Sequence, residues 1–301
     1  MRCRRALAAV LLLAVAALVG CGTEPAGPPP VPAGTLRVAS YDFAENQILA
    51  EVYAEAIRRA ELPVVVQHGI GTREVVLPAL EQGVVDVVVD YLGTAYDFVR
   101  PGAPPVHHEP GPLHAELAAI LAGRGATLLA AAEAEDQNGF AVLTAFAEEH
   151  GVGRLSDLAP LAPGLTFGGP PECPQRRYCL AGLREVYGLR FGEVRSMPSR
   201  SATVEALLSG EIDVGMLETT DPRLADAPLV LLLDDRGLQP HENVVPIVRT
   251  AALEGAGEPL RTALDEVSAQ LSTTDLVQLN RAVAIDGLTP AEAAARWWDA
   301  L

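Results

Sequence analysis

The 301-residue sequence predicts an α/β fold in which helices cover both faces of largely parallel sheets. Short apolar runs alternate with helical stretches from residue 35 onward, the order typical of strands joined by helical crossovers. The apolar runs are rich in valine and show no polar alternation, as strands buried on both faces do. One helix–glycine–strand pattern also occurs twice along the chain.

The first part of the predicted domain has the order strand, helix, strand, helix, strand. Apolar residues at helical spacing predict one helix over 45–61, and a second over 73–82 is ended by glycine. Valine-rich runs predict the strands, at 36–40, 64–66 and 84–89.

The C-terminal part is predicted to be helical, with helices at 258–271 and 274–284 followed by a last one. Thr289 and Glu292 have the spacing of a capping box, with a proline at the first helical position. The last helix carries Trp297 and Trp298, which we interpret as packing residues.

The repeated pattern covers residues 79–87 and 206–214, which share Ala, Leu, Gly, Asp and Val at the same offsets. A polar loop follows each copy, at 90–94 and 218–221. Ligands of open α/β sheets bind beyond the carboxyl ends of the strands, so two such units facing each other would form a cleft. The alternative is that the two copies are unrelated, because this pattern is common in α/β proteins.

The N-terminus resembles the export signal of a bacterial lipoprotein. Arginines at 2, 4 and 5 precede an apolar stretch, 6–19, which has the length of a signal-peptide core and is short for a membrane span. The sequence Leu18–Cys21 resembles a lipobox, which implies cleavage before Cys21 and acylation of that cysteine. We therefore expect a signal peptide over 1–20 and a proline-rich tether over 21–34. The alternative is an ordinary secretory signal with an incidental cysteine.

Two of the four cysteines remain in the exported domain, because Cys3 leaves with the signal and Cys21 takes the lipid. Export into an oxidising compartment makes a Cys173–Cys179 disulfide the expectation. Their spacing fits neither a CxxC redox pair nor a zinc site.

The formal charge of -17 argues against nucleic acid and anionic lipid as partners, because an acidic chain repels both. Acidic surfaces also serve solubility alone, which is the simpler explanation. With 49% hydrophobic residues the chain is too apolar to be disordered.

Sequence motifs for catalysis are missing, so we predict neither an enzyme nor a cofactor. GxSxG, HExxH and phosphate-loop sequences do not occur. His107, His108 and His114 lie in a proline-rich segment without the spacing of metal ligands, so no metal is predicted. We interpret Asp234 and Asp235 as the end of a strand, and not as a catalytic pair.

Several short segments, in their order and spacing, resemble the substrate-binding proteins of ABC importers for glycine betaine, choline and related osmoprotectants. The resemblance runs from residue 35 to the last third of the chain. The matching segments are 38–45, 83–94 with its Tyr-x-Gly-Thr sequence, 155–158, 172–176, 182–183, 187–189, 219–221, 233–235 and Asn280.

That resemblance implies the type II periplasmic-binding-protein fold, with two α/β lobes of mixed sheets joined by two hinge crossings. The crossings would lie near Asn138 and Pro246. The first lobe would comprise 35–138 and 246–301, and the second 139–245. Closure around a ligand would be a hinge motion.

The family's ligands are quaternary ammonium zwitterions, whose cation lies in an aromatic cage and whose carboxylate meets an arginine. The resemblance places Tyr91 and Phe140 at cage positions and Thr94 at a ligand-contacting hydroxyl. Asn138 lies beside Phe140, and Arg176 takes the position of the carboxylate-binding arginine. Alternatives stay open, with Tyr91 on the rim, Phe140 in the core and Arg176 in a surface salt bridge.

Two other cage tyrosines of the family are replaced here by Val204 and Glu218. A carboxylate at Glu218 can pair with a ligand cation that carries N–H groups, so another betaine or an amino-acid derivative is as suitable a ligand as glycine betaine. Ser40 and Asp42 follow the first strand and complete the expected ligand-binding set. A disulfide between the two remaining cysteines would fix the loop that bears Arg176, or simply staple a surface loop.

The sequence thus predicts a monomeric, lipid-anchored, extracytoplasmic receptor that delivers a zwitterionic or cationic solute to an ABC permease and its ATPase. Membrane contact would come through the lipid anchor only. A ligand-sensing domain that signals without transport is the alternative, and an enzyme on the same fold is a weaker one.

Overall fold

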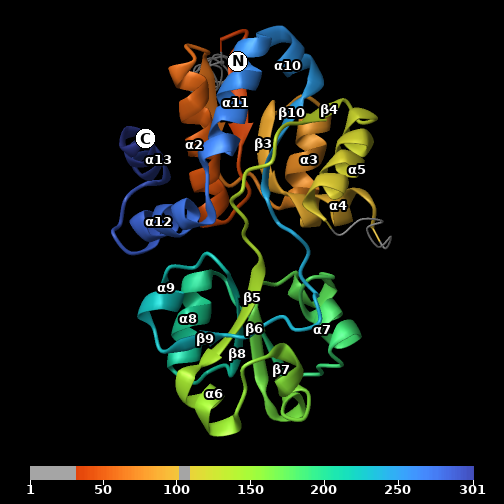
Figure 1. Cartoon of the computed structure of the whole chain (residues 1–301), viewed down its shortest axis with the longest axis vertical. Coiled ribbons are helices and arrows are strands. Elements are labelled where there is room, and N and C mark those ends of the chain that lie inside the picture. The colour runs from red at the N-terminus through yellow and green to blue at the C-terminus, as the bar shows by residue number, and fades with distance from the viewer. Residues whose placement is uncertain (1–31, 102–108) are drawn as a thin grey trace, which may run out of the picture. The chain divides into compact units, whose positions relative to one another are not determined.

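Two five-stranded sheets form the framework of the computed structural model, which describes residues 32–101 and 109–301 (Figure 1). Both sheets belong to the unit formed by residues 35–301. The expected signal peptide, Cys21 with its expected lipid, most of the expected tether, His107 and His108 lie outside the described residues.

The first sheet has the order β2-β1-β3-β10-β4, with β1 parallel to β2 and β3, and β10 antiparallel to β3 and β4. We call this sheet and the helices packed on it the first lobe. The strands are β1 (Leu36–Ala39), β2 (Val64–Gln67), β3 (Val87–Tyr91), β4 (Ala126–Leu128) and β10 (Val244–Arg249). The helices are α2 (Ala44–Arg59), α3 (Arg73–Glu81), α4 (Leu92–Val99), α5 (Pro110–Ala122), α10 (Thr250–Ala256), α11 (Glu258–Gln270), α12 (Thr273–Ala284) and α13 (Pro290–Ala300).

The second sheet has the order β7-β6-β8-β5-β9, with β6 parallel to β7 and β8, and β5 antiparallel to β8 and β9. This sheet and its helices are the second lobe. The strands are β5 (Asn138–Leu143), β6 (Thr166–Gly169), β7 (Glu193–Ser196), β8 (Val214–Glu218) and β9 (Leu229–Leu231). The α-helices are α6 (Thr144–His150), α7 (Leu180–Val186), α8 (Arg200–Leu208) and α9 (Arg223–Asp226), and the 3-10 helices are η1 (Leu155–Leu158), η2 (Ala162–Gly164) and η3 (Cys173–Gln175).

The two sheets share one topology, in which three parallel strands are followed by an antiparallel strand and an edge strand. The repeated sequence pattern occupies the same place in both, at α3–β3 and at α8–β8. Gly83 and Gly210 end the two helices in the left-handed conformation, with φ of 73° and 70°. Asp86 accepts a hydrogen bond from the backbone N–H of Arg37, where β1 begins, and Asp213 accepts one from Thr166, where β6 begins. The glycine and the aspartate that the two copies share therefore have the same structural role in both lobes.

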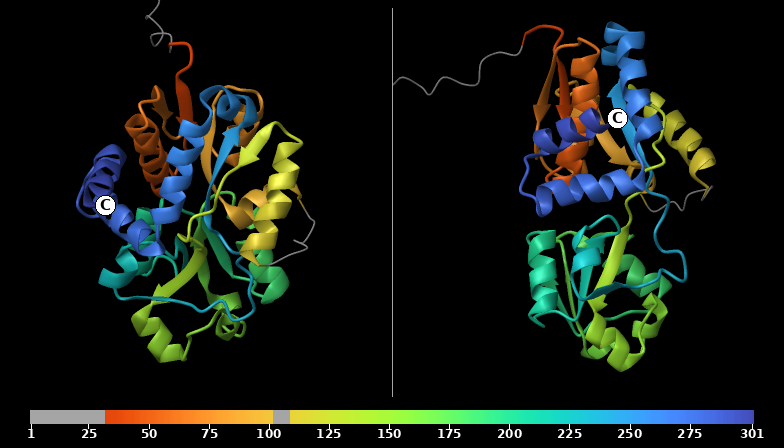
Figure 2. Two further views of the ribbon diagram at one scale, coloured as in Figure 1. Left: turned by 45° about the horizontal axis from the view of Figure 1, so that its top comes forward. Right: turned by 60° about the vertical axis from the view of Figure 1, so that its left-hand side comes forward.

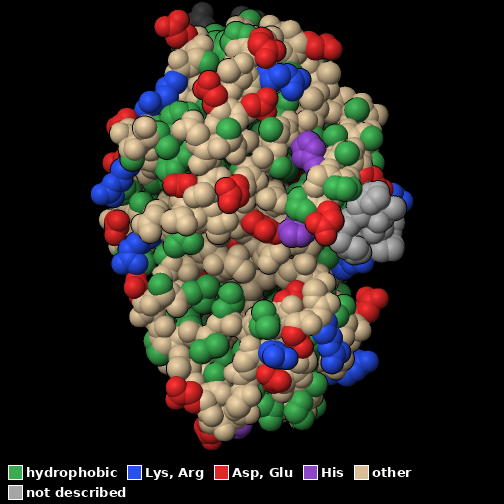
Figure 3. Space-filling view, viewed as in Figure 1, with side chains coloured by type: hydrophobic (Ala, Val, Ile, Leu, Met, Phe, Trp, Pro, Cys, Tyr) green, Lys and Arg blue, Asp and Glu red, His purple; other side chains and the backbone are tan. Residues whose placement is uncertain are grey.

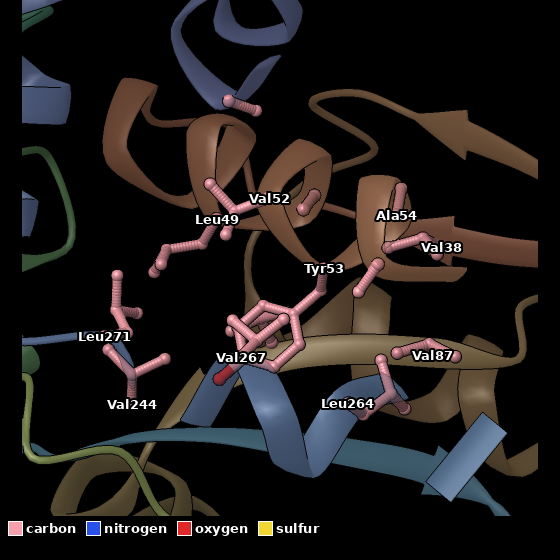
Figure 4. Close-up of a cluster of buried hydrophobic side chains, with 14 of the residues drawn as sticks. Val38, Leu49, Val52, Tyr53, Ala54, Val87, Val244, Leu264, Val267 and Leu271 are labelled. Carbon is pink, nitrogen blue, oxygen red and sulfur yellow. The ribbon is translucent and has the colours of Figure 1, made fainter. Parts of the chain in front are cut away.

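Helices bury both faces of the first sheet, which explains its valine-rich strands (Figures 1 and 2). One face packs against α2, α11, α12 and α13, and the other against α3, α4 and α5. Tyr53 of α2 lies in the first of these cores beside Leu264 and Val267 of α11 (Figure 4), and its hydroxyl lies 3.0 Å from Ser268 Oγ. In the second lobe α6 and α7 cover one face and α8 the other. The predicted α/β fold with two mixed sheets is confirmed.

Most predicted elements match within two residues at each end, and the strand expected at 84–89 differs most. That strand begins at Val87, because the N–H groups of Val84 and Val85 bond to the carbonyl of Ala79 at the end of α3. The last helix begins at the predicted capping box, where Thr289 and Glu292 exchange hydrogen bonds.

Trp297 packs in the core of the first lobe, and the indole N–H of Trp298 donates to the carbonyl of Val52. Asn138 is the first residue of β5, and Pro246 lies within β10 opposite Val89. Among residues 32–101 and 109–301, no helix combines the length and apolarity needed to cross a bilayer.

Candidate functional site

A cavity of about 190 Å³ lies where strand ends of the first lobe meet those of the second. It is smaller than the roughly 300–1,000 Å³ typical of pockets for drug-sized ligands, so its size suits a small solute. The first lobe contributes the segment after β1, the start of α3 and the β3–α4 junction. The second lobe contributes residues 170–179, the start of α8 and the end of β8.

Aromatic rings form one wall of the cavity. Tyr41 and Phe43 stack with ring centroids 6.1 Å apart, and Phe43 stacks on Tyr91 at 6.0 Å. Tyr178 of the second lobe also lines the space. Aromatic faces carry negative electrostatic potential, so this wall favours a cation.

A buried ion pair supports that wall from the first lobe. Arg73 donates to Asp90 through Nη2 at 2.6 Å and through Nε at 3.1 Å, and its guanidinium carbon lies 5.2 Å from the centroid of the Tyr41 ring. The same Nη2 donates to the hydroxyl of Thr94 at 2.8 Å. The arginine is thus fixed by its partners, and Thr94 is positioned by the arginine.

Glu242, a buried acid of the crossing before β10, lies against the N-terminus of α4. Its carboxylate accepts the backbone N–H groups of Gly93 at 2.9 Å and Thr94 at 3.1 Å, where the helix dipole favours negative charge. Only glycine fits at 93, because a Cβ there would lie 2.4 Å from the ring of Pro240. Burial raises the pKa of Glu242 to about 8, although the N–H of Thr94 and the charge of Arg73 act in the opposite direction.

A second ion pair, between Arg200 and Glu218, lies on the wall of the second lobe. Arg200 is the first residue of α8, and Glu218 is the last residue of β8. Both side chains are largely shielded from water, with 26% and 14% exposed. Glu218 therefore lies at the cavity as the sequence suggests, with an arginine already beside it.

A disulfide-closed loop of the second lobe reaches across to the first. Cys173 and Cys179 are bonded, with Cα atoms 5.3 Å apart, and both line the cavity. Between them, Arg176 forms an ion pair with Glu74 at 2.7 Å, and the next residue, Arg177, contacts Asp97 at 3.4 Å. The loop thus forms part of the rim and contacts both lobes.

A hydrogen-bonded cluster beside the cavity also joins the lobes. Thr220, after β8, donates to Glu45 of α2 at 2.6 Å and contacts Asp136 at 2.9 Å. Glu45 also accepts from the hydroxyl of Tyr91 at 2.7 Å and from Asn280 of α12 at 2.6 Å. Burial raises the pKa of both carboxyl groups, and for Asp136 the nearby charges of Glu45 and Glu218 add to the shift.

The structure brings six of the eight predicted ligand-binding residues to the cavity. They are Asp42, Tyr91, Thr94, Asn138, Arg176 and Glu218. Ser40 is fully buried, and its hydroxyl accepts the N–H of Gly69. Phe140 is 1% exposed and packs on Phe167 in the core of the second lobe, 6.2 Å between centroids, so it does not line the cavity. The roles of all eight residues in binding stay predictions.

Sequence reasoning missed further residues that line the cavity, among them Tyr41, Phe43, Arg73, Arg200 and Glu242. The first four follow the ends of parallel strands, so the strand-end rule that selected Ser40 and Asp42 would have found them. Glu242 lies in the crossing before β10, and no sequence pattern marks it.

Charged side chains outside the cavity are mixed in sign. Figure 3 shows acidic and basic side chains interspersed over one face, with no broad patch of a single charge. The acidic excess of the sequence is therefore spread out on this face.

Comparisons with known proteins agree with this arrangement. The family model "Substrate binding domain of ABC-type glycine betaine transport system" matches residues 34–300. A glycine-betaine-binding protein of Pseudomonas aeruginosa is 27% identical over 87% of this chain and 86% of its own length. The glycine betaine-binding protein YehZ of Escherichia coli is 24% identical over 87% of this chain and 89% of its own length.

Among solved structures, a glycine betaine/carnitine/choline ABC transporter protein superposes with a TM-score of 0.72 at 21% identity. The match covers 88% of this chain and 98% of that one. This likeness confirms the two-lobed fold of type II periplasmic binding proteins.

Proposed function

The chain belongs to the family of substrate-binding domains of ABC-type glycine betaine transport systems, and from this premise we propose that it captures a small zwitterionic or cationic solute in the cavity between its lobes. As a member of this family, it is an extracytoplasmic substrate-binding protein of an ABC importer and not an enzyme. Its partners are accordingly a permease and an ATPase.

The observation that carries the proposal is an aromatic wall facing an ion pair across one small cavity. Tyr41, Phe43 and Tyr91 line the cavity from the first lobe, while Arg200 and Glu218 present a positive and a negative group from the other lobe. A ligand that carries both charges can replace each partner of the ion pair with one of its own groups. A ligand with a positive charge alone would take Glu218 from Arg200 in a shielded site, so of the two proposed classes a zwitterion suits the ion pair better.

The proposed ligand class follows from Glu218, which takes the place of a further aromatic ring. Glu218 offers carboxylate oxygens, which serve an N–H cation through hydrogen bonds and a quaternary ammonium only as a charge. We therefore favour betaines with additional donors and amino-acid-derived zwitterions beside glycine betaine itself.

The predicted binding residues take these roles in the proposal. Tyr91 supplies a ring face, Thr94 and Asn138 supply polar groups, and Arg176 supplies a guanidinium at the rim. The lobes predicted at 35–138 with 246–301 and at 139–245 would close by hinge motion at the two crossings. Asp42, which is exposed at the cavity, would add to the negative potential that attracts a cation.

Attachment through an acylated Cys21 and a monomeric state also belong to the proposal. Replacing Cys21 with alanine would leave no thiol for a lipid, so the protein would move from the membrane fraction to the soluble fraction. Protein that stays with the membrane in this variant would contradict the anchor.

A thermal-shift screen tests the proposed function, with glycine betaine, choline, carnitine, ergothioneine and free amino acids as probes. A ligand present at about 100 times its dissociation constant adds about 2.7 kcal/mol to the free energy of unfolding. Calorimetry on each positive compound should give one site per chain. The variant Tyr91→Ala should lose affinity, with Phe140→Leu as the control, because Phe140 lies in the core. Absence of any shift across the panel would contradict the ligand class.

A further inference from the structure

Two buried carboxyl groups meet at one hydroxyl where the lobes touch. Glu45 lies in the first turn of α2, Asp136 lies in the crossing between β4 and β5, and Thr220 follows β8 of the second lobe. The side-chain oxygen of Thr220 is 2.6 Å from Glu45 Oε2 and 2.9 Å from Asp136 Oδ1. Glu45 and Asp136 are only 5% and 7% exposed.

There are too few hydrogen-bond donors to satisfy both groups as carboxylates. The Thr220 hydroxyl has one hydrogen and donates to one oxygen at a time. Glu45 has two further donors, the Tyr91 hydroxyl at 2.7 Å and the Asn280 amide at 2.6 Å, and so suits the charged form. Asp136 otherwise receives only longer bonds, from the Thr219 hydroxyl at 3.2 Å and the Thr220 N–H at 3.3 Å.

Several acidic groups around the pair share one arginine, Arg200. Within the described residues neither carboxyl group forms an ion pair, as no arginine, lysine or histidine nitrogen lies within 4.0 Å of either. The charged neighbours are Glu218 on β8 and its partner Arg200 on α8, whose positive charge also acts on Asp136. On the remaining sides, α12 presents the neutral Asn280, and β3 presents Tyr91, whose pKa burial raises well above its ordinary value.

Two carboxylates this close and this buried repel each other strongly, and a single proton removes the repulsion. Burial raises the pKa of Asp136 well above its usual range, and the charges of Glu45 and Glu218 raise it further. Geometry, hydrogen count and electrostatics therefore agree on which group is neutral.

We propose that the Glu45–Asp136 pair holds one proton on Asp136 whenever the lobes are in contact, and that closure around a ligand takes up this proton from solvent. The part concerning ligand capture rests on the proposed function. When the lobes separate, Thr220 withdraws and water reaches both groups.

The sign of the resulting pH dependence follows from these two states. In the open form water reaches both groups and brings the pKa of Asp136 down toward its ordinary value, whereas in the closed form burial holds that pKa higher. The closed form is therefore favoured most strongly below the ordinary pKa, and the advantage is lost as the pH rises toward the raised value. Ligand affinity should fall with rising pH, by at most about tenfold per pH unit.

Calorimetry with glycine betaine at about pH 7, in two buffers of different protonation enthalpy, counts the protons taken up on binding. The test variant is Asp136→Asn, which keeps the shape and is neutral at every pH. On binding, wild type should take up as much as one proton more than the variant does. The Kd of wild type should rise with pH, while that of the variant should change less. Protons exchanged by Glu242 cancel in this difference. The matched control is Asp226→Asn, which removes an exposed ion pair to Arg281 that also joins the lobes, at 2.6 Å. It should leave the pH slope unchanged.

Equal proton uptake by wild type and Asp136→Asn would overturn the proposal, and so would greater proton release by wild type. The latter is the result expected if a ligand cation paired with an ionised Asp136. If glycine betaine does not bind, the ligand class is in question, and the protons are counted with whichever compound of the thermal-shift panel does bind. With that compound at saturation, which keeps the lobes in contact, the melting temperature of the variant should gain on that of wild type as the pH rises from about 5 to about 8.5, whereas a constant difference would overturn the proposal.

Discussion

Replacing Arg176 with alanine separates two roles that the rim loop can have. In the structure this arginine pairs with Glu74 of the other lobe, and the two side chains are 37% and 49% exposed. An ion pair so exposed contributes about 0.2–1 kcal/mol, which is at most about fivefold in Kd. A charged hydrogen bond to a ligand carboxylate contributes about 1.5–3 kcal/mol, which is roughly 10- to 150-fold.

We expect Arg176→Ala to weaken binding of a carboxylate ligand by about 1.5–3 kcal/mol, because the guanidinium exchanges Glu74 for the ligand. The companion variant Glu74→Gln should then bind as well as wild type or more tightly, since it frees the arginine. If the arginine only holds the lobes together, Glu74→Gln should bind more weakly, and Arg176→Ala should have no effect in the Glu74→Gln background.

Calorimetry of the two single variants and the double variant measures these outcomes, with choline as the probe that lacks a carboxylate. Choline should lose little affinity in Arg176→Ala. A loss below about fivefold for carboxylate ligands, together with weaker binding by Glu74→Gln, would refute a direct contact and leave Arg176 as a closing residue.

Three further predictions concern other parts of the site and its support. Replacing both Cys173 and Cys179 with serine should lower the free energy of unfolding by about 2 kcal/mol, because the closed loop is short, and urea denaturation would show it. Glu218→Gln should weaken N–H-bearing cations by about 1.5–3 kcal/mol and quaternary cations less, which competition calorimetry can rank; equal losses would contradict the role assigned to its oxygens. Phe140→Ala should lower the free energy of unfolding by about 3–5 kcal/mol through a core cavity, and Phe140→Leu should leave affinity unchanged, whereas a selective loss of affinity would return Phe140 to the site.

The fold could be predicted from the sequence more completely than the residues of the site. Helix and strand positions follow from periodicity and valine content, and the repeat at 79–87 and 206–214 identified equivalent parts of the two sheets because Gly83 and Gly210 share a left-handed conformation. The strand at 84–89 was placed too early, since the residues after Gly83 complete the end of the preceding helix before pairing begins.

Site residues were harder to predict because the direction of a side chain depends on neighbours distant in sequence. Phe140 and Asn138 are two residues apart on β5, yet the ring enters the core and the amide faces the cavity. Arg200 approaches Glu218 only because α8 and β8 pack together. The contacts of Glu45 with Thr220 and Asn280 join segments separated by 175 and 235 positions, which no local pattern encodes.

The way the chain passes through the two sheets has a consequence for its biogenesis. Strand β10 lies between β3 and β4, although more than a hundred residues separate it from either. An exported chain that emerges N-terminus first therefore exposes β1 to β4 without the strand that joins β3 to β4, while β5 to β9 form one uninterrupted stretch. The later-emerging half can complete its sheet alone, whereas the earlier half must wait, with apolar edges open, until residue 249 has crossed. Secretion of this protein should thus depend on whatever shields that waiting half from aggregation.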